Sequence, residues 1–418
     1  MKKMLGVLLA MAIAFPASAD VLKNVNLKGE IQTIASDVRT NNNFVPAPYN
    51  TGVTTRVMAG LSADLVEDVT ANFMFQYANF WGNDAASGNS AQNYWDSVRL
   101  VEGNVVLSNL FCCLEATIGR QFYGEEDSEV LYFGPNHYNA EFNGYAPSLD
   151  ALKLAYADDV KSFTFIAGKA NMTHLVGISD NGFINVQHGA VGPFANTFDI
   201  FGADFKLKLA EEFYAKIYGY DFMDSQAILS EDKHIGFYGA KIGADMQAMR
   251  FAVQYNRNFG GKRLVKEHEG TGHMAKVDFA MDIETLTARA AYMYANQNFF
   301  ALGNYTPGLL IGHDMGGAVW NYSTEGLSMF NLGFDMKAFE KWTFALDGYS
   351  FQDRRFHHGA TWEADLTAKY DHNEYVQLFA GVGYVKYTKT DAANVPLYSK
   401  NVLGADNVKG QLGMLIKF

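Results

Sequence analysis

The connections between strand-like segments of this sequence alternate between short and long, and this alternation constrains the fold more than any other feature. Short connections are expected at 66–68, 158–160, 209–211, 246–248, 283–284, 338–340 and 371–373, with a further one around 108–112. Long connections are expected at 37–51, 82–94, 123–148, 170–196, 223–234, 260–273, 295–328, 352–359 and 388–407. A β-sandwich has no reason to alternate its connections, whereas a transmembrane β-barrel has short turns at one end and long loops at the other. The pattern favours an up-and-down transmembrane β-barrel.

The segments themselves alternate apolar and polar residues with a period of two. In 52–65, Val53, Val57 and Leu61 fall on one face, while Arg56 and Asp64 fall on the other. In lipid every backbone N–H and C=O needs a partner, and an antiparallel sheet provides all of them only when it closes on itself. One face of each strand then meets lipid and the other meets the lumen. Alternation therefore replaces the long apolar runs of a helical membrane protein.

The number of segments predicts the size of the barrel. They begin near residues 25, 52, 69, 95, 113, 149, 161, 197, 212, 235, 249, 274, 285, 329, 341, 360, 374 and 408. We therefore expect an all-β, antiparallel barrel of about 18 strands, with 16 also compatible. Aromatic residues gather at segment ends, as in Tyr77/Trp81 and Tyr218/Tyr220, which is typical of interfacial girdles. A large secreted β-sandwich would also alternate, but its outer face should be polar.

The first 19 residues have the three parts of a secretory signal peptide. A basic start precedes an apolar stretch at 5–15, and small residues at 17–19 form a cleavage site. We expect residues 1–19 to be removed and residues 20–418 to form a single barrel domain. An uncleaved N-terminal anchor is the alternative.

Composition excludes several other classes of protein. After the leader no apolar run approaches the ~18–20 residues that a spanning helix needs. Aromatic residues make up 14% of the chain, which argues against disorder, and two Cys cannot build a disulfide scaffold. The net charge of −12 argues against a nucleic-acid partner. Cys112 and Cys113 are adjacent, and both a vicinal disulfide and a pair of thiols stay open.

The chain ends in a strand that closes on an aromatic residue. Leu412, Met414, Ile416 and Phe418 share one face of this last segment. It is similar to the terminal strand of bacterial outer-membrane barrels, in which the final aromatic residue is read by the barrel assembly machinery. The resemblance implies that Phe418 is an assembly signal and that the protein lies in the lipid of the outer membrane.

A further resemblance runs along the chain, to the alginate-export family of porins. It is carried by four stretches: 116–121 (ATIGRQ) with 124–127 (GEED), 149–154 (LDALKL), 362–370 (WEADLTAKY) and 379–384 (FAGVGY). The resemblance implies an 18-stranded barrel that acts as a monomer, with a trimer as the alternative. It supports the architecture well and the identity of the solute poorly.

Ten side chains are candidate pore-lining residues, because alternation or position directs them to the polar face: Arg56, Arg99, Arg120, Lys153, Arg250, Arg289, Lys337, Lys369, Glu363 and Asp365. A bulge would switch the face of Arg99 and Arg120, so the direction of these two stays open. The set is compatible with a basic ladder that guides an anionic solute or with a mixed-charge wall braced by ion pairs. Because acids match bases closely along these strands, we favour the mixed-charge wall.

The connection at 123–148 carries five acidic residues and no Lys or Arg. It could fold inward as a constriction or bind cations, but the interpretation we favour is a solvated acidic surface loop.

No metal-binding, phosphate-binding or nucleophile motif is present, so we expect neither an enzyme nor a cofactor. The sequence predicts a porin for passive diffusion of small hydrophilic, anionic or carbohydrate-like solutes. The alternative is a surface adhesin or structural barrel whose long loops bind partners.

Overall fold

The structure is a computed structural model of the chain. It describes residues 23–40, 51–81, 98–111, 113–126, 128–138, 146–171, 197–224, 234–259, 271–296, 299, 307–310, 327–353, 361–386 and 407–418. The leader at 1–19 and Cys112 lie outside the described residues, so the cleavage site and the cysteine pairing stay predictions.

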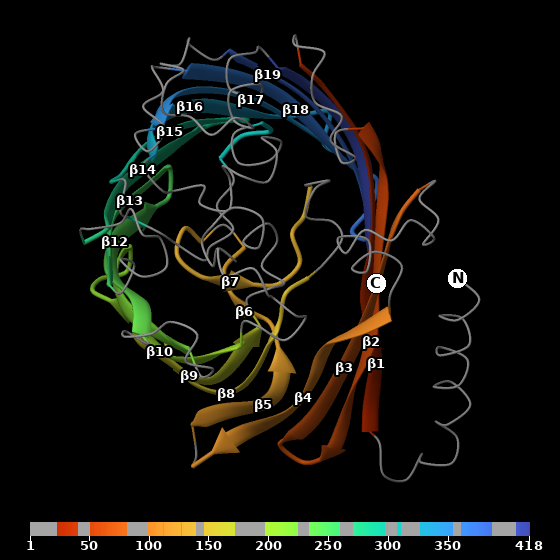
Figure 1. Ribbon diagram of the computed structural model, residues 1–418, viewed down its shortest axis with the longest axis vertical. Helices are drawn as coiled ribbons and strands as arrows, with labels where there is room; N and C mark the ends of the chain where they lie inside the picture. Colours follow the sequence, from red (N-terminus) through yellow and green to blue (C-terminus); the bar gives the residue numbers. More distant parts are fainter. Residues whose placement is uncertain are drawn as a thin grey trace, which may run out of the picture.

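Eighteen antiparallel strands form one sheet that closes into a barrel through the pairing of β1 with β20 (Figure 1). The prediction of an 18-stranded barrel is confirmed. The strands are β1 (Lys23–Thr40), β2 (Thr51–Val66), β3 (Val69–Phe80), β4 (Val98–Leu110), β5 (Leu114–Gln121), β8 (Leu149–Ala157), β9 (Lys161–Asn171), β10 (Thr197–Lys208), β11 (Phe213–Asp224), β12 (His234–Met246), β13 (Met249–Phe259), β14 (His273–Ile283), β15 (Leu286–Ala295), β16 (Leu327–Ala338), β17 (Trp342–Asp353), β18 (Thr361–Asp371), β19 (Val376–Lys386) and β20 (Asn407–Lys417).

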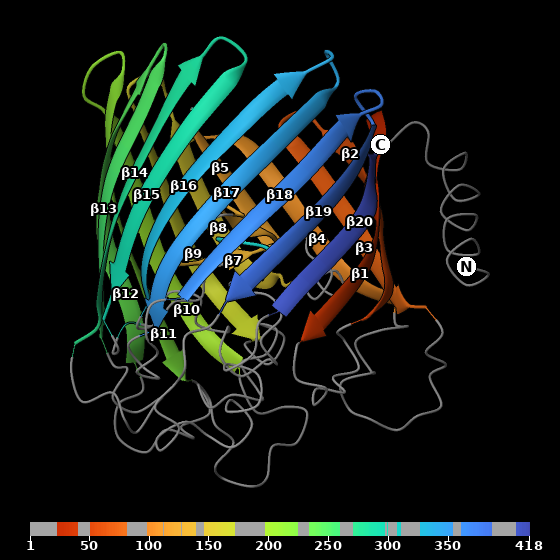
Figure 2. The same cartoon turned by 90° about the horizontal axis from the view of Figure 1, so that it is seen from above.

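Short turns join the strands at one end of the barrel, and Figure 2 shows them together at the top of the view. Several of these turns place a residue in the left-handed backbone region, for example Asp68 at φ 62° and Glu284 at φ 53°. Asp tolerates this region because its short polar side chain can hydrogen-bond locally. The alternation of short and long connections therefore corresponds to the two ends of the barrel.

The two faces of each strand differ as the period of two predicts. On β13, Phe251, Val253 and Tyr255 are exposed on the outside, whereas Gln254 and Asn256 are buried inside. Outer residues of the other strands are likewise Leu, Phe, Val and Ile. An apolar outer face with a polar inner face suits a wall between lipid and water. Among the described residues no helix is long and apolar enough to cross a membrane.

The C-terminal residue is hydrogen-bonded to the first strand, where the barrel closes. The Gly29 N–H donates to the Phe418 carbonyl at 2.7 Å, and the Phe418 N–H donates to the Gly29 carbonyl at 3.0 Å. A Cβ on residue 29 would lie 2.8 Å from the Phe418 ring, so only glycine leaves room for that ring. The terminal aromatic residue thus covers the first strand on the outer face.

A small hairpin lies inside the ring of strands. It consists of β6 (Tyr123–Gly124) and β7 (Tyr132–Phe133), and Figure 1 shows both within the barrel. The connection between β5 and β8 therefore turns into the lumen. This is the feature that shapes the candidate site.

Candidate functional site

The connection between β5 and β8 crosses the lumen and contacts both walls. We call its described residues 122–126 and 128–138 the inner segment. Asn136, His137 and Tyr138 contact β1, β2 and β19, whereas Tyr123 and Glu129 contact strands β10, β11 and β14 on the far side of the ring (Figure 1). The favoured interpretation of 123–148 as a solvated surface loop is wrong for these residues, because Glu125 and Glu129 pair with lysines of the lumen wall.

The first anchor of the inner segment is a buried ion pair. The Arg56 side chain on β2 is 0% exposed, and its Nη2 donates to Glu30 Oε1 of β1 at 2.7 Å. The same nitrogen donates to the Asn136 carbonyl at 2.9 Å. One guanidinium nitrogen therefore joins the wall to the inner segment.

The His137 ring lies between two carboxylates of this anchor. Its Nε2 is 2.8 Å from Glu30 Oε2, and its Nδ1 is 2.8 Å from Glu126 Oε2. Ionised carboxylates only accept hydrogen bonds, so both contacts require that both ring nitrogens carry a proton. Burial alone would lower the pKa of His137, but its hydrogen bonds to Glu126 and Glu30 outweigh burial and raise the pKa. The anchor is therefore complete only with the imidazolium form.

Tyr138 extends the first anchor towards the last strands. Its backbone N–H donates to Gln32 Oε1 at 3.1 Å, and its hydroxyl donates to Gln377 Oε1 of β19 at 2.7 Å. The Lys369 ammonium lies 3.9 Å above the centre of the Tyr138 ring, a cation–π contact. Gln411 of β20 donates to the Tyr138 carbonyl at 3.2 Å. These contacts fix the inner segment to both sides of the β1–β20 closure.

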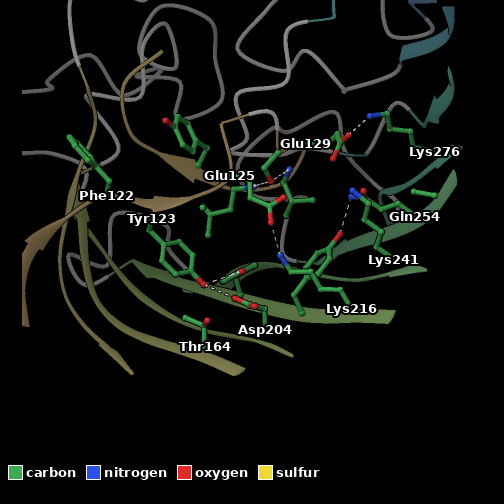
Figure 3. Close-up of a pocket in the computed structure, with 18 of the residues that line it drawn as sticks. Phe122, Tyr123, Glu125, Glu129, Thr164, Asp204, Lys216, Lys241, Gln254 and Lys276 are labelled. Atoms are coloured by element: carbon green, nitrogen blue, oxygen red, sulfur yellow. Dashed lines mark hydrogen bonds and ion pairs between the residues drawn. The ribbon is translucent and has the colours of Figure 1, made fainter. Parts of the chain in front are cut away.

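The second anchor lies on the opposite wall and is shown in Figure 3. The Tyr123 hydroxyl donates to Asp204 Oδ2 at 3.2 Å and lies 3.1 Å from the Tyr220 hydroxyl. Two acids of the hairpin pair with lysines of the wall. Lys216 Nζ is 3.4 Å from Glu125 Oε1, and Lys276 Nζ is 2.6 Å from Glu129 Oε1. The acids of this connection thus neutralise wall lysines.

A second short stretch, 307–310, is held against the inner face of β17 and β18. The Leu309 N–H donates to Asp365 Oδ2 and the Leu310 N–H donates to Glu363 Oε1, both at 2.8 Å. The Tyr349 hydroxyl donates to the Pro307 carbonyl at 2.5 Å. Both carboxylates are buried. Two candidate pore-lining acids therefore bind backbone rather than open water.

Two cavities among the described residues lie against the barrel wall, and the inner segment lines the first of them. The larger, of about 740 Å³, is bounded by the hairpin and by strands β8–β14, and Lys153, Lys216, Lys241 and Lys276 line it. The smaller, of about 390 Å³, lies against β11–β17 and is lined by Arg250 and Arg289. Lys276 and Asp278 line both cavities. The two cavities therefore lie against neighbouring parts of one wall.

Most of the candidate bases lie near an acid. Arg250 Nη2 is 3.1 Å from Asp282 Oδ1, and Lys153 Nζ is 3.7 Å from Glu115 Oε1. Arg289 pairs with Asp335 at 2.6 Å and with Asp347 at 3.1 Å. These pairs support the mixed-charge wall over a uniformly basic ladder.

The two remaining candidates on the inner face are Lys337 and Arg99. Lys337 is exposed near the turn end of β16. Arg99 on β4 stands opposite Gln76 of β3 in the register, and Gln76 is buried in the lumen. The bulge expected in this segment is present between Met74 and Phe75 of the β3–β4 pairing.

Arg120 needs a correction, because its side chain lies on the outer face of the barrel. Its Nη2 is 2.7 Å from Asp150 Oδ2 and its Nε is 2.8 Å from Asp150 Oδ1. Arg120 follows the exposed Ile118 by two residues, which places both on one face. Lys169 and Asp199 continue the same row on β9 and β10 as a second ion pair. This row of charged residues lies at the border of the outer apolar face, at the strand ends away from the short turns. It does not line the pore.

Sequence reasoning did not single out Glu30 or His137 and gave no partner for Lys276. The contacts of these residues join positions 107 and 147 apart in the chain, which no local pattern reveals. The one available indication was the excess of acids without bases in 123–148, which implies compensating bases elsewhere. Among the described residues no group of His, Cys, Asp and Glu is placed to hold a metal ion.

Comparisons with known proteins agree on the architecture. No family model matches the chain, and no curated protein sequence matches it. Among solved structures it is similar to OccK3 (OpdO) of Pseudomonas aeruginosa, with a TM-score of 0.61, 10% identity, and coverage of 96% of this chain and 97% of that one. It is also similar to the outer membrane protein OprD from Pseudomonas aeruginosa, with a TM-score of 0.58 and 10% identity over 94% of each chain.

A third similar structure is Pseudomonas aeruginosa OpdK with vanillate, at a TM-score of 0.61 and 9% identity over 95% of this chain and 99% of that one. At such identities the likeness establishes the fold, an 18-stranded barrel, and leaves the solute open.

Proposed function

We propose that the chain is an outer-membrane porin through which small hydrophilic solutes diffuse passively. The observation that carries this proposal is a closed barrel with an apolar outer face, whose lumen holds the inner segment, ion pairs and cavities. Barrels of about eight strands fill with side chains, whereas 16–18 strands leave an aqueous channel. The described cavities lie along such a channel.

The orientation follows from the connections. Short turns face the periplasm and long loops face outward in outer-membrane barrels. The leader at 1–19 supports export, and Phe418 supports recognition by the barrel assembly machinery. We propose a monomer embedded in outer-membrane lipid. A relation to alginate-export porins and a carbohydrate-like solute stay hypotheses within this proposal.

Passive diffusion is tested by the swelling of liposomes that contain the purified protein. Sugars of increasing size are added outside, and the proposal expects swelling with small sugars and a cut-off as size increases. Liposomes that do not swell with any sugar would contradict diffusion through the barrel.

Lys241 is the base we propose to contact the solute. It lines the larger cavity on β12, directly opposite Lys216 in the register, and among the described residues no carboxylate oxygen lies within ion-pair distance of its ammonium. Its neighbours Lys216 and Lys276 are both paired with acids of the inner segment. The inner segment therefore leaves one positive charge available to an anionic group. OpdK, a similar structure, was solved with vanillate, and we propose an organic anion here as well.

Replacing Lys241 with Gln is expected to lower the anion-to-cation permeability ratio by about sevenfold, because one unit charge acting at about 7 Å in water favours a monovalent anion and disfavours a monovalent cation by about threefold each. The ratio is measured from reversal potentials across a salt gradient in a planar bilayer. K337Q is the matched control, because Lys337 lies exposed at the turn end, and it should shift the ratio less. An equal shift in both variants would refute a special role of Lys241.

A further inference from the structure

We infer that the outer surface of β12–β15 binds a phosphate group of lipid A, the glycolipid of the outer leaflet, with Arg257 and His273 as the donors. We call Tyr238, Arg257, His273 and Tyr294 the outer patch. It lies on the lipid-facing side of the barrel and is separate from the lumen and from the solute that passes through it.

Arg257 points out of the barrel at the end of its strand. Val253, Tyr255 and Phe259 of β13 are exposed on the outer face, and Arg257 shares that face because it lies two residues from both Tyr255 and Phe259. It is itself exposed. A long connection follows Phe259, the last residue of β13, and long connections face the cell exterior in outer-membrane barrels. Arg257 therefore lies at the level of the outer-leaflet headgroups.

The guanidinium of Arg257 is available to a group outside the chain. Three other bases of this outer border are paired with acids: Arg120 with Asp150, Lys169 with Asp199, and His234 with Asp221. Among the described residues, by contrast, no carboxylate oxygen lies within ion-pair distance of Arg257. Arg257 thus presents a full positive charge and a fork of N–H donors to the surrounding lipid.

His273 provides a second donor beside it. The two residues stand opposite each other in the β13–β14 register. Asn296 fixes the imidazole: its Oδ1 accepts the His273 backbone N–H at 3.1 Å, while its Nδ2 donates to the Thr271 carbonyl and lies 3.1 Å from His273 Nδ1. An amide nitrogen only donates, so Nδ1 accepts and the ring proton is on Nε2. The Nε2–H group is then free to donate on the side of the ring away from Asn296.

Two tyrosines flank these donors. Tyr238 stands opposite Arg257 on β12 and is 46% exposed. The Tyr294 ring lies 5.9 Å from the His273 ring at an interplanar angle of 36°. Tyrosine gathers at the headgroup level because its ring is apolar and its hydroxyl is polar. The outer patch therefore combines hydrogen-bond donors with apolar surface.

This combination matches a phosphate that is carried by a lipid. An arginine guanidinium binds phosphate through two parallel N–H donors, and the imidazole N–H adds a third. The apolar residues below Arg257 on β13, Val253 and Tyr255, face the acyl chains of the same lipid. Because the outer patch faces sideways into the membrane, a headgroup in the leaflet reaches it, whereas a solute in the lumen does not.

The binding of lipid A to the purified barrel in detergent micelles tests this site. Native mass spectrometry gives the dissociation constant of the first bound lipid, for diphosphoryl lipid A and for the same lipid without its phosphates. We expect the diphosphoryl form to bind more tightly, and R257Q to weaken it by about tenfold, the effect of losing a hydrogen bond to a charged group. H273F keeps an aromatic ring beside Tyr294 but has no N–H, and we expect a loss of about the same size.

K386Q is the matched control, because it removes the same charge from the same border of the barrel. Lys386 is exposed at the end of β19 and stands opposite the exposed Trp362. Charges further apart than about 8 Å are largely screened at 0.15 M salt, so K386Q should bind diphosphoryl lipid A as the unmodified barrel does. An equal loss in R257Q and K386Q would show diffuse attraction by net charge and overturn the site.

Two further results would also contradict a lipid phosphate site. One is equal binding of lipid A with and without its phosphates, which would mean that only the apolar surface is recognised. The other is complete displacement of the lipid by inorganic phosphate, which would assign the outer patch to a free anion. The circular dichroism spectrum of each variant, with its β-sheet minimum, shows that the barrel has folded.

Discussion

Replacing Arg56 with Met is expected to lower the free energy of unfolding by about 3–5 kcal/mol, the usual effect of removing one partner from a buried ion pair. The Arg56 side chain is 0% exposed and Glu30 is 10% exposed, so water compensates little for the lost charge. The Asn136 carbonyl loses its donor as well. Urea unfolding in detergent micelles, followed by tryptophan fluorescence, measures the change.

The control for this variant is R56K. Only Nη2 of Arg56 makes the recorded contacts to Glu30 and Asn136, so a lysine ammonium can replace much of what the guanidinium does. R56K should therefore keep most of the stability. A loss in R56M below about 1 kcal/mol, the range of an exposed pair, would show that this anchor contributes little.

Raising the pH is expected to weaken the first anchor and to increase conductance. The pKa of His137 is raised in the folded protein, so its contribution is fully present below its unfolded pKa of about 6.5 and is lost as the pH rises through the folded value. A neutral imidazole can donate only one hydrogen bond, so the contact with Glu30 or with Glu126 is lost.

The first anchor is retained when the pH falls moderately below neutral. Burial would raise the pKa of Glu126, but its hydrogen bond to His137 lowers it, so this contribution is lost only as the pH falls through that lowered value. The anchor is thus complete between the lowered pKa of Glu126 and the raised pKa of His137.

Conductance measured as a function of pH should rise above this window in the unmodified protein. The rise should be absent in H137F, which cannot change its charge. His234 is the matched control, since it is also paired with a carboxylate, Asp221, at 2.8 Å, but lies away from the inner segment. H234Q should keep the rise in conductance. An unchanged rise in H137F would show that another group is responsible.

The strands were predictable because their chemistry repeats at short range. A lipid-facing strand must alternate, and 52–65 does so from Val53 to Leu65, which places Arg56 inside as expected. The positions of the short turns could be predicted from the places where the apolar–polar alternation is interrupted. The terminal strand was equally clear, because its outer residues lead directly to Phe418, which pairs with Gly29.

The inner segment was not predictable from local pattern. Its acids look like those of a solvated loop until their partners are known, and those partners lie on the far wall. The face on which Arg120 lies was unpredictable for a different reason. One register shift in the β4–β5 pairing decides on which face of the sheet the following residues lie. Alternation in the sequence determines which residues share a face, but the bulges decide which face that is.

The most direct test of the account is the single-channel conductance of the purified protein in a planar lipid bilayer. The account predicts discrete open steps from the unmodified chain, and larger steps when residues 125–131 are replaced by a short glycine linker, because most of the described residues of that range line the larger cavity. A barrel that inserts but stays silent in both forms would contradict a water-filled channel restricted by the inner segment.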